Sequence, residues 1–431
     1  MTRQNEPSYR APWSPERSID GVHGTMWEGS RDRIACVVGT RPEAVKMAPV
    51  ILELRRRPWA DPVVITTGQH GSVVEQTLGC FGIEPDVGLG TRHRPHSLSQ
   101  LSARLLRELG GHLDRADWRA VVVQGDTSSA LAGSLAGFFS SIPVVHVEAG
   151  LRSGDLRSPF PEEAHRRMIA QVSSLHLAPT HHADANLRRE ALSVGRAVVT
   201  GNTVIDAVVM AGRSAAAAGD PLVRRIEASS SRLVLVTAHR RENWGEPIAR
   251  IGRAVAELSR RHRGTTFLMA AHMNPAVRSA LEEATRGLAN VLLPGPVAYA
   301  PFSRLLSRAR LVITDSGGIQ EEAAAFGLPV LVTRRNTERF EGLCGGLARL
   351  VGTEQAAIVA AAEEELARAD AFLEAGESGA PHLRPNPYGD GLAAQRCAAA
   401  CGWLLGHNDR PQDIPPPPVS EGLPVVPVGR S

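Results

Sequence analysis

The chain has 431 residues, of which 43% are hydrophobic, 22% charged and only 4% aromatic. Its 48 basic and 45 acidic residues leave a net charge of +3, which gives no support for binding to nucleic acid or to a membrane surface. The composition is typical of a globular protein long enough for two domains. Five scattered cysteines form no disulfide framework, and no stretch resembles a signal sequence or a membrane-spanning helix, so a cytoplasmic location is expected.

Short apolar runs alternate with helical patterns along most of the chain. The predicted strands lie near residues 34–39, 62–67, 120–125, 143–147, 175–178, 197–200, 232–238, 265–271, 291–293, 311–314 and 329–333. The predicted helices include residues 97–109, 128–140, 246–261, 275–286, 317–326 and 354–373. This alternation predicts an α/β fold with parallel sheets covered on both faces. The eleven strands fit two sheets better than one, with the break near residues 200–215.

The segment GTRPE at 39–43 joins the first predicted strand to a helix. Gly39 permits a tight turn, and Pro42 suits the first turn of a helix. Arg41 and Lys46 flank the helix N-terminus, where the helix dipole attracts anions, and this favours a diphosphate as the ligand. The structural alternative is a solvated arginine–glutamate pair at the surface.

Three carboxylates form the most suggestive set of polar residues. Asp126 and Glu148 follow neighbouring predicted strands, and Glu162 follows a loop rich in glycine and proline. Ligands of an open parallel sheet bind beyond the carboxyl ends of its strands. We therefore expect the three side chains in one cleft, where they suit acid–base chemistry on a sugar carbon. Each has a structural alternative when taken singly, and Asp126 in particular suits the cap of the following helix.

His239, in TAHRRENW, ends a predicted strand and precedes two arginines, so we interpret it as a functional residue. His146, His176 and His272 also lie in or beside apolar strands, and we expect them to be mainly structural. No HExxH motif and no cysteine–histidine cluster has the spacing of a metal site, so the sequence predicts no metal.

The segment LVITDSGGIQEEA places Ser316, Gly317 and Gly318 between a strand and a helix. Bare backbone amides at such a position suit a phosphate. Glu321 and Glu322 follow; one of them could accept hydrogen bonds from sugar hydroxyls such as those of a ribose, or both simply favour the helix N-terminus. No GxxxxGK[ST] or GxGxxG sequence is present, so ATPase, kinase and NAD-dependent functions lose their usual support.

Taken together, these segments resemble those of the non-hydrolysing UDP-N-acetylglucosamine 2-epimerases. The matching segments run in order over residues 33–405, and they are GTRPEAVKMAPVI (39–51), TGQH (67–70), QGDT (124–127), HVEAGLRSGD (146–155), SPFPEEAHR (158–166), GNTVIDA (201–207), TAHRREN (237–243), TDSGGIQEEA (314–323), TERFEG (337–342) and NPYGDG (386–391). The resemblance implies two Rossmann-like domains in a glycosyltransferase-B arrangement, with the substrate between them and a C-terminal helix packed on the first domain.

Composition predicts two disordered tails, a polar one at residues 1–31 and a proline-rich one at residues 408–431. Between them, the resemblance implies an N-terminal Rossmann-like domain (32–205), a C-terminal Rossmann-like nucleotide-binding domain (206–385) and a returning helix (386–407). The expected partners are a UDP-sugar and, because family members are usually homodimers, a second copy of the chain. Nucleic acid and membrane are not expected.

The implied reaction is the reversible C2 epimerisation of UDP-GlcNAc to UDP-ManNAc, through elimination of UDP to a 2-acetamidoglucal and its re-addition, without NAD or a metal. The resemblance assigns catalysis to Asp126, Glu148, Glu162 and His239. It assigns substrate binding to Arg41, Lys46, Val297, Phe302, Ser316, Gly317, Gly318, Glu322 and Arg339. Within this second set, Val297 and Phe302 correspond to the uracil pocket and Glu322 to a ribose contact.

Other functions stay open on the sequence alone. They are a hydrolysing 2-epimerase that releases ManNAc and UDP, a sugar transferase of the same fold, and a nucleotide-sugar sensor without turnover. The chain also departs from the family's pattern. His165 replaces an asparagine, and Ser72 replaces a glutamine near the segment linked in some members to activation by a second UDP-GlcNAc, which puts that regulation in doubt.

Overall fold

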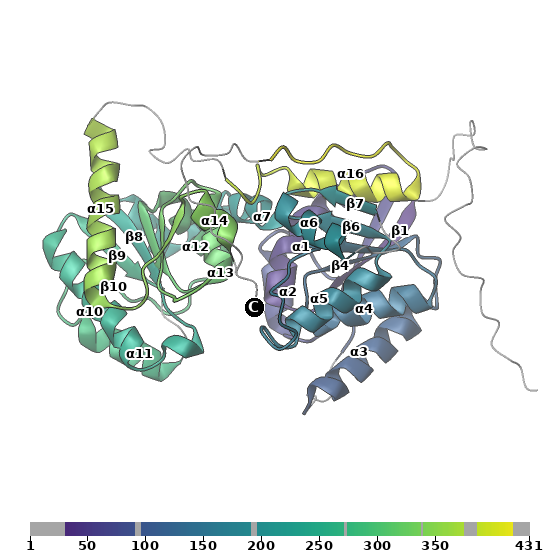
Figure 1. The fold of residues 1–431 in the computed structure, drawn as a ribbon, viewed down its shortest axis with the longest axis horizontal. Coiled ribbons are helices and arrows are strands. Elements are labelled where there is room, and N and C mark those ends of the chain that lie inside the picture. The colour runs from purple at the N-terminus through teal and green to yellow at the C-terminus, as the bar shows by residue number, and fades with distance from the viewer. Residues whose placement is uncertain are drawn as a thin grey trace, which may run out of the picture.

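Two parallel β-sheets, each covered by helices on both faces, make up the chain (Figure 1). The structure is a computed structural model, which describes residues 31–90, 96–190, 196–270, 274–337, 339–374 and 386–416. The predicted α/β fold with two parallel sheets is confirmed. We call residues 31–199 together with α16 (Ala393–Leu405) the first lobe, and residues 203–374 the second lobe.

The first sheet has seven strands in the order β3-β2-β1-β4-β5-β6-β7, and all neighbouring pairs are parallel. Its strands are β1 (Asp32–Val38), β2 (Ala60–Thr66), β3 (Val87–Gly88), β4 (Ala120–Gln124), β5 (Val144–Val147), β6 (Leu175–Ala178) and β7 (Arg196–Val199). Side chains alternate along a strand, so Ile34 and Cys36 of β1 pack on one face, and Ala35 and Val37 pack on the other. Because both faces are buried, these strands are continuous hydrophobic runs.

Helices cover both faces of the first sheet. α1, α2 and α16 bury apolar side chains on one face, and α3, α4 and α5 do so on the other. The helices of this lobe that precede β7 are α1 (Arg41–Arg55), α2 (Ser72–Gly79), α3 (Leu98–Leu113), α4 (Ser128–Phe139), α5 (Glu162–Val172) and α6 (His181–Arg189). Figure 1 shows α16, in yellow, lying across the first lobe, although it follows the whole second lobe in sequence.

The second sheet has six strands in the order β10-β9-β8-β11-β12-β13. Its strands are β8 (Arg232–Thr237), β9 (Thr265–Met269), β10 (Val291–Leu292), β11 (Leu311–Thr314), β12 (Val330–Val332) and β13 (Ala348–Leu350). The helices of this lobe are α7 (Thr203–Gly212), α8 (Ala215–Gly219), α9 (Pro221–Glu227), α10 (Glu246–Arg261), α11 (Pro275–Ala284), α12 (Tyr299–Arg308), α13 (Gly317–Ala324), α14 (Phe340–Cys344) and α15 (Gln355–Glu374), with a short 3-10 helix at Arg241–Asn243.

Each of the eleven predicted strands has a counterpart in the structure, and two further strands, β3 and β13, were not predicted. Neither is a buried apolar run, since Gly88 of β3 and both Arg349 and Leu350 of β13 are exposed, so a search for such runs does not find them. Both lie at the end of a sheet, where a few backbone hydrogen bonds to one neighbour define them.

The chain after α16 runs beside β7. The Val199 amide donates to the Asp413 carboxylate at 2.7 Å, the Ile414 amide donates to the Val199 carbonyl at 2.8 Å, and Arg410 donates to the Ala197 carbonyl at 3.0 Å. The prediction of an unpacked tail is therefore wrong for residues 408–414, because the free edge of β7 offers backbone groups that pair with them. The rest of the predicted tails, residues 1–30 and 417–431, lies outside the described residues.

Across the part of the chain that the structure describes, no helix is both long and apolar enough to pass through a bilayer.

Candidate active site

Charged side chains from the two lobes meet beyond the carboxyl ends of the strands. Lys46 on α1 forms an ion pair with Glu148, which follows β5, and its Nζ also lies 3.5 Å from an Oε2 of Glu321 on α13 of the second lobe. A second contact between the lobes is the hydrogen bond of 3.1 Å from Thr180 to Glu341. Candidate residues that are distant in sequence therefore surround one region between the lobes.

The turn after β1 requires glycine. A methyl group on Gly39 would lie 1.9 Å from the Oγ of Ser129 and 2.5 Å from the Oγ1 of Thr67. Ser129 is itself held by Gln69, whose Oε1 accepts hydrogen bonds from the Ser129 hydroxyl at 2.7 Å and its amide at 3.2 Å. The turn before α1 is therefore packed directly against the first turn of α4, and α1 begins with Arg41 just after this turn.

The N-terminus of α1 is occupied by the chain's own carboxylate. Glu43 accepts hydrogen bonds from the amides of Gly39 at 2.9 Å and Thr40 at 2.6 Å, and from the Thr127 hydroxyl at 2.5 Å. Glu43 thus satisfies these two amides, so the expected contact with a diphosphate stays a prediction that concerns the side chains of Arg41 and Lys46. Burial raises the pKa of Glu43 to about 7, although these hydrogen bonds lower it. Sequence inspection missed this role, although the spacing T-x-x-E indicates a capping box.

We expect the substitution Glu43→Gln to remove a pH dependence of stability. The pKa of Glu43 is raised from 4.5 to about 7 in the folded protein, so the folded protein binds the proton more tightly than the unfolded chain does. The stability that the protonated group contributes is complete below the unfolded pKa and is lost as the pH rises through about 7. Between pH 5 and 8, the free energy of unfolding should fall by roughly 2 kcal/mol more in the wild type than in the variant. Urea unfolding at several pH values measures the difference, and parallel curves would contradict the prediction.

Glu148 is held by three donors. Its carboxylate accepts hydrogen bonds from Lys46 and Gln124, and from the Nδ2 of Asn202 at 3.2 Å. The residue has a φ of +63°, a left-handed conformation that is uncommon outside glycine and that places it sharply after β5. Its side chain is 8% exposed, so its charge is compensated within the protein. Gln124 and Asn202 were missed by sequence inspection, although both follow or end a strand of the same sheet.

Asp126 pairs with an arginine and does not cap α4. Its Oδ2 accepts hydrogen bonds from the Nε of Arg166 at 2.8 Å, and its backbone carbonyl lies 2.8 Å from the Nδ1 of His165. The cap of α4 is instead Thr127, whose hydroxyl accepts from the Ala130 amide at 3.1 Å. Asp126 is therefore not the helix cap that the sequence allowed. His165, the departure from the family's pattern, contacts the backbone of a proposed catalytic residue.

Glu162 begins α5, the helix that also supplies His165 and Arg166 to Asp126. It is half-buried, and across the described residues no hydrogen bond or ion pair engages its carboxylate. The next residue, Glu163, differs: it is fully buried and accepts from the Ser153 amide at 3.0 Å. Of the two adjacent glutamates, Glu163 thus anchors the preceding loop, whereas Glu162 makes no such contact among the described residues.

In the second lobe, Asp315 organises the loop that carries His239. The buried Asp315 carboxylate accepts hydrogen bonds from the amides of His239 at 3.0 Å and Arg240 at 2.9 Å, and from the Nδ2 of Asn243 at 3.0 Å. The His239 Nδ1 lies 3.3 Å from the same carboxylate, while its side chain stays 41% exposed. Asp315 was not among the residues predicted from the sequence, because the prediction for the segment after β11 relied on Ser316 and the glycines that follow it.

The N-terminus of α13 is open to an anion. Ser316 precedes the helix without a side-chain cap on it. The guanidinium groups of Arg240 and Arg339 lie within 3.8 Å of the point where a side chain on Gly317 would begin. Backbone amides and two guanidinium groups therefore surround the start of this helix, as a phosphate site requires. Two arginines thus lie beside the phosphate site expected at residues 316–318. Arg339 was predicted to bind the nucleotide, whereas Arg240 was not predicted.

Glu321 and Glu322 face different partners. Glu321 lies 2.6 Å from the Nε of Arg339 and also contacts Lys46. Burial and then the charge of Glu321 raise the pKa of Glu322 to about 7, against the opposing charges of Arg41 and Lys46. The charge of Arg41 in the first lobe thus acts on a carboxyl group of the second lobe. The sequence left open which of the two glutamates binds a ligand, and in the structure the two side chains have different neighbours.

The remaining predicted residues are two apolar side chains of the second lobe and three histidines. Val297 and Phe302, before and within the first turns of α12, are half-buried against the core of the second lobe. His146 is structural: its Nε2 lies 2.8 Å from the Gly125 carbonyl, and burial lowers the pKa of its imidazole to about 4. His176 is also buried, and His272 lies outside the described residues.

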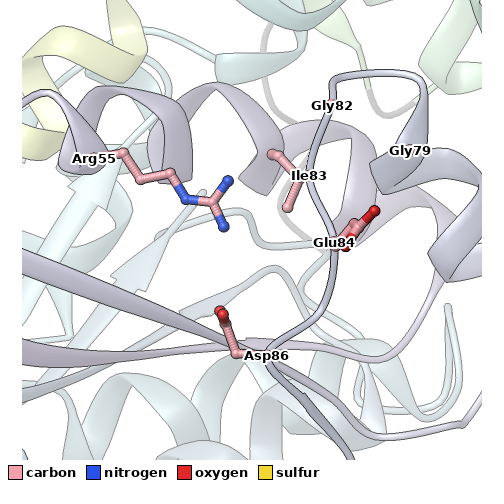
Figure 2. A pocket seen from close by; sticks show the side chains of 6 residues that line it. All are labelled: Arg55, Gly79, Gly82, Ile83, Glu84 and Asp86. Atoms are coloured by element: carbon pink, nitrogen blue, oxygen red, sulfur yellow. The ribbon is translucent and has the colours of Figure 1, made fainter.

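A separate cavity of about 380 Å³ lies in the first lobe, and Figure 2 shows the residues that line it. They are Arg55, Gly79, Gly82, Ile83, Glu84 and Asp86. None of the candidate site residues lines it, and the Asp86 carboxylate instead accepts from the Val64 amide at 2.7 Å. Within the described ranges, no group of three or more histidine, cysteine or acidic side chains has a metal-binding arrangement.

Comparison with known proteins places the chain among enzymes that act on a nucleotide sugar. The model of a family described as UDP-N-acetylglucosamine 2-epimerase matches residues 52–401. The chain is 40% identical over 374 residues to the UDP-N-acetylglucosamine 2-epimerase of Escherichia coli, covering 85% of this chain and 98% of that one. It is 39% identical over 376 residues to that of Salmonella typhimurium, with the same coverage of 85% and 98%.

Solved structures give the same result. The UDP-GlcNAc 2-epimerase of Neisseria meningitidis bound to UDP-GlcNAc has a TM-score of 0.72 and 38% identity, covering 84% of this chain and 97% of that one. The enzyme of Methanocaldococcus jannaschii in complex with UDP-GlcNAc and UDP has a TM-score of 0.68 and 30% identity, covering 86% and 99%. A glycosyltransferase of Rickettsia africae, at 12% identity and a TM-score of 0.55 over 88% and 100%, shares the fold alone.

Proposed function

The chain belongs to the UDP-N-acetylglucosamine 2-epimerase family, and from this premise we propose that it interconverts UDP-GlcNAc and UDP-ManNAc by removing UDP and adding it back. The observation that carries the proposal is the position of Lys46, which contacts Glu148 of the first lobe and Glu321 of the second. A nucleotide sugar bound between the lobes then has its pyranose beside the carboxylates of the first lobe. Its diphosphate lies beside α13 and the cations of the second lobe.

In the first step, the bond between C1 and the UDP oxygen breaks, and the electron pair leaves with UDP. A carboxylate removes the proton from C2, and a double bond forms between C1 and C2, which gives the 2-acetamidoglucal. In the second step, UDP adds back to C1 and a proton is delivered to the opposite face of C2. Glu162, whose carboxylate has no partner among the described residues, is suited to one proton transfer. Asp126 and Glu148 complete the set.

The departing diphosphate needs positive charge. Lys46 from α1, Arg240 and Arg339 around Gly317, and the amides of α13 supply it from both lobes. His239, held through its backbone by Asp315, is exposed enough to reach the same groups. Arg41 adds a further charge from the start of α1, and its influence on the pKa of Glu322 supports a position beside the nucleotide. We assign Glu322 to the ribose and Val297 and Phe302 to the uracil.

The test is incubation of the purified protein with UDP-GlcNAc in heavy water. We expect a mixture of UDP-GlcNAc and UDP-ManNAc, with deuterium at C2 of both. Free ManNAc formed in step with UDP would instead support a hydrolysing epimerase. Transfer of the sugar to an added acceptor without exchange at C2 would support a sugar transferase. The absence of both exchange and product from any UDP-HexNAc would overturn the proposal.

We also propose that the protein is a homodimer. Support comes from α4, where Phe138 and Phe139 are 53% and 66% exposed, because two adjacent exposed aromatic rings are unfavourable in water unless a partner covers them. Light scattering after gel filtration should give a mass of twice the 46.0 kDa chain. A mass that remains monomeric at micromolar concentration would contradict this proposal and leave the reaction untouched.

A further inference from the structure

We propose that Glu321 is a positioning residue, which holds Lys46 of the first lobe and Arg339 of the second side by side so that both meet the departing diphosphate. The proposal rests on the proposed function, since it presumes a nucleotide sugar between the lobes. Glu321 thereby receives a role in diphosphate binding, whereas the adjacent Glu322 is the residue assigned to the ribose.

The contacts of Glu321 support this task directly. One carboxylate oxygen lies 2.6 Å from the Nε of Arg339, and the other lies 3.5 Å from the Nζ of Lys46. The Glu321 side chain is only 3% exposed, and those of Lys46 and Arg339 are 12% and 19% exposed. Water therefore screens these charges little, and the pairs are worth more than pairs at the surface.

A negative charge between Lys46 and Arg339 is needed because these two cations otherwise repel each other. Burial alone lowers the pKa of Lys46, and the charge of Arg339 lowers it further, but Glu148 and Glu321 raise it above its ordinary value. Lys46 therefore stays charged between two carboxylates of different lobes. A diphosphate that enters then meets two cations that Glu321 already holds in place.

The contacts continue on both sides and close into a ring. Glu148, the other partner of Lys46, accepts a hydrogen bond from the side chain of Asn202 at 3.2 Å. The Asn202 amide donates to the Tyr388 carbonyl at 2.7 Å, and the Tyr388 hydroxyl accepts from the Gly342 amide at 3.0 Å. The same hydroxyl lies 3.5 Å from the carbonyl of Arg339. Glu321 is thus the member of the ring that joins the phosphate-binding arginine to the lysine beside the catalytic carboxylate.

The test is a double-mutant cycle on UDP affinity, measured by titration calorimetry without turnover. We expect Glu321→Gln to raise the Kd for UDP about tenfold, because the amide keeps the shape of the side chain but not its charge. In the background of Lys46→Met, the same substitution should raise the Kd no more than about threefold, since one of the two groups it holds is gone. Glu364→Gln, which breaks an exposed pair with Arg349, is the matched control and should leave UDP affinity unchanged.

An equal loss of UDP affinity in both backgrounds would overturn the proposal, and so would wild-type affinity in Glu321→Gln. If the glutamine variant is unstable, as its melting temperature would show, Glu321→Asp keeps the charge and should bind UDP within about threefold of the wild type. A tenfold loss in that variant would count against the proposal. Failure of the proposed function would be recognised by a different result. The variants would bind UDP with the affinities expected here, but the wild type would exchange no deuterium at C2 of the sugar.

Discussion

Replacing Glu148 by glutamine is expected to lower the rate of epimerisation by roughly a thousandfold, within the range that a lost acid–base group commonly costs. The amide keeps the size of the side chain, and Gln124 and Asn202 remain in place around it. It removes the charge that Lys46 faces in the first lobe and any capacity to take a proton. UDP should still bind within a few fold of the wild type, because most of the proposed nucleotide contacts come from the second lobe. Steady-state rates and UDP titration together measure the two effects.

The matched control for Glu148→Gln is Glu190→Gln, which removes a carboxylate of the same lobe that pairs with Arg152 at 2.6 Å. It should leave the rate within about threefold of the wild type, as expected for a partly exposed ion pair. Asp126→Asn and Glu162→Gln belong with Glu148→Gln and should also lose most of the activity while UDP binds. Near-normal rates in all three would refute the site, whereas loss of UDP binding in Glu148→Gln would mark a structural role.

The second large effect is expected from Gly39→Ala. The added methyl group would lie 1.9 Å from the Oγ and 2.5 Å from the Cβ of Ser129, and 2.5 Å from the Oγ1 of Thr67. These neighbours are tied by hydrogen bonds to each other and to Gln69, so the backbone itself must shift. We expect a loss of about 3 kcal/mol or more in the free energy of unfolding, at the upper end of the cost of overpacking. Epimerase activity should fall as well, because the turn carries the start of α1.

A suitable control is Gly79→Ala. Gly79 ends α2 within the same lobe, and a methyl group there has no atom within 4 Å. Alanine also has the higher helix propensity, so stability should stay equal or rise slightly. Urea unfolding of both variants beside the wild type tests the pair. Equal stability of Gly39→Ala and the wild type would show that the turn opens without cost.

The α/β fold, the two parallel sheets and most strand positions were predictable because each strand is a buried apolar run bounded by a turn. The same positions predicted where Asp126, Glu148 and His239 would lie, since ligands bind beyond the carboxyl ends of parallel strands. The family followed from ordered motifs, and the comparisons confirm it. What the sequence alone failed to predict was local: short edge strands, the pairing of residues 408–414 with β7, and the carboxylate of Glu43 on the first residues of α1.

The identity of the charged partners depended on the tertiary structure. Lys46 and Glu321 are far apart in sequence, and no local sequence pattern predicts that they face each other across the lobes. The two adjacent pairs, Glu162 with Glu163 and Glu321 with Glu322, look alike as sequence. Neighbouring residues on a helix point about 100° apart, so the two members of each pair have different neighbours: Glu163 is buried whereas Glu162 is half-buried, and Glu321 contacts Lys46 and Arg339. Apolar periodicity therefore determined the fold and the edge at which chemistry occurs, whereas the assignment of each charge required the folded neighbourhood that compensates it.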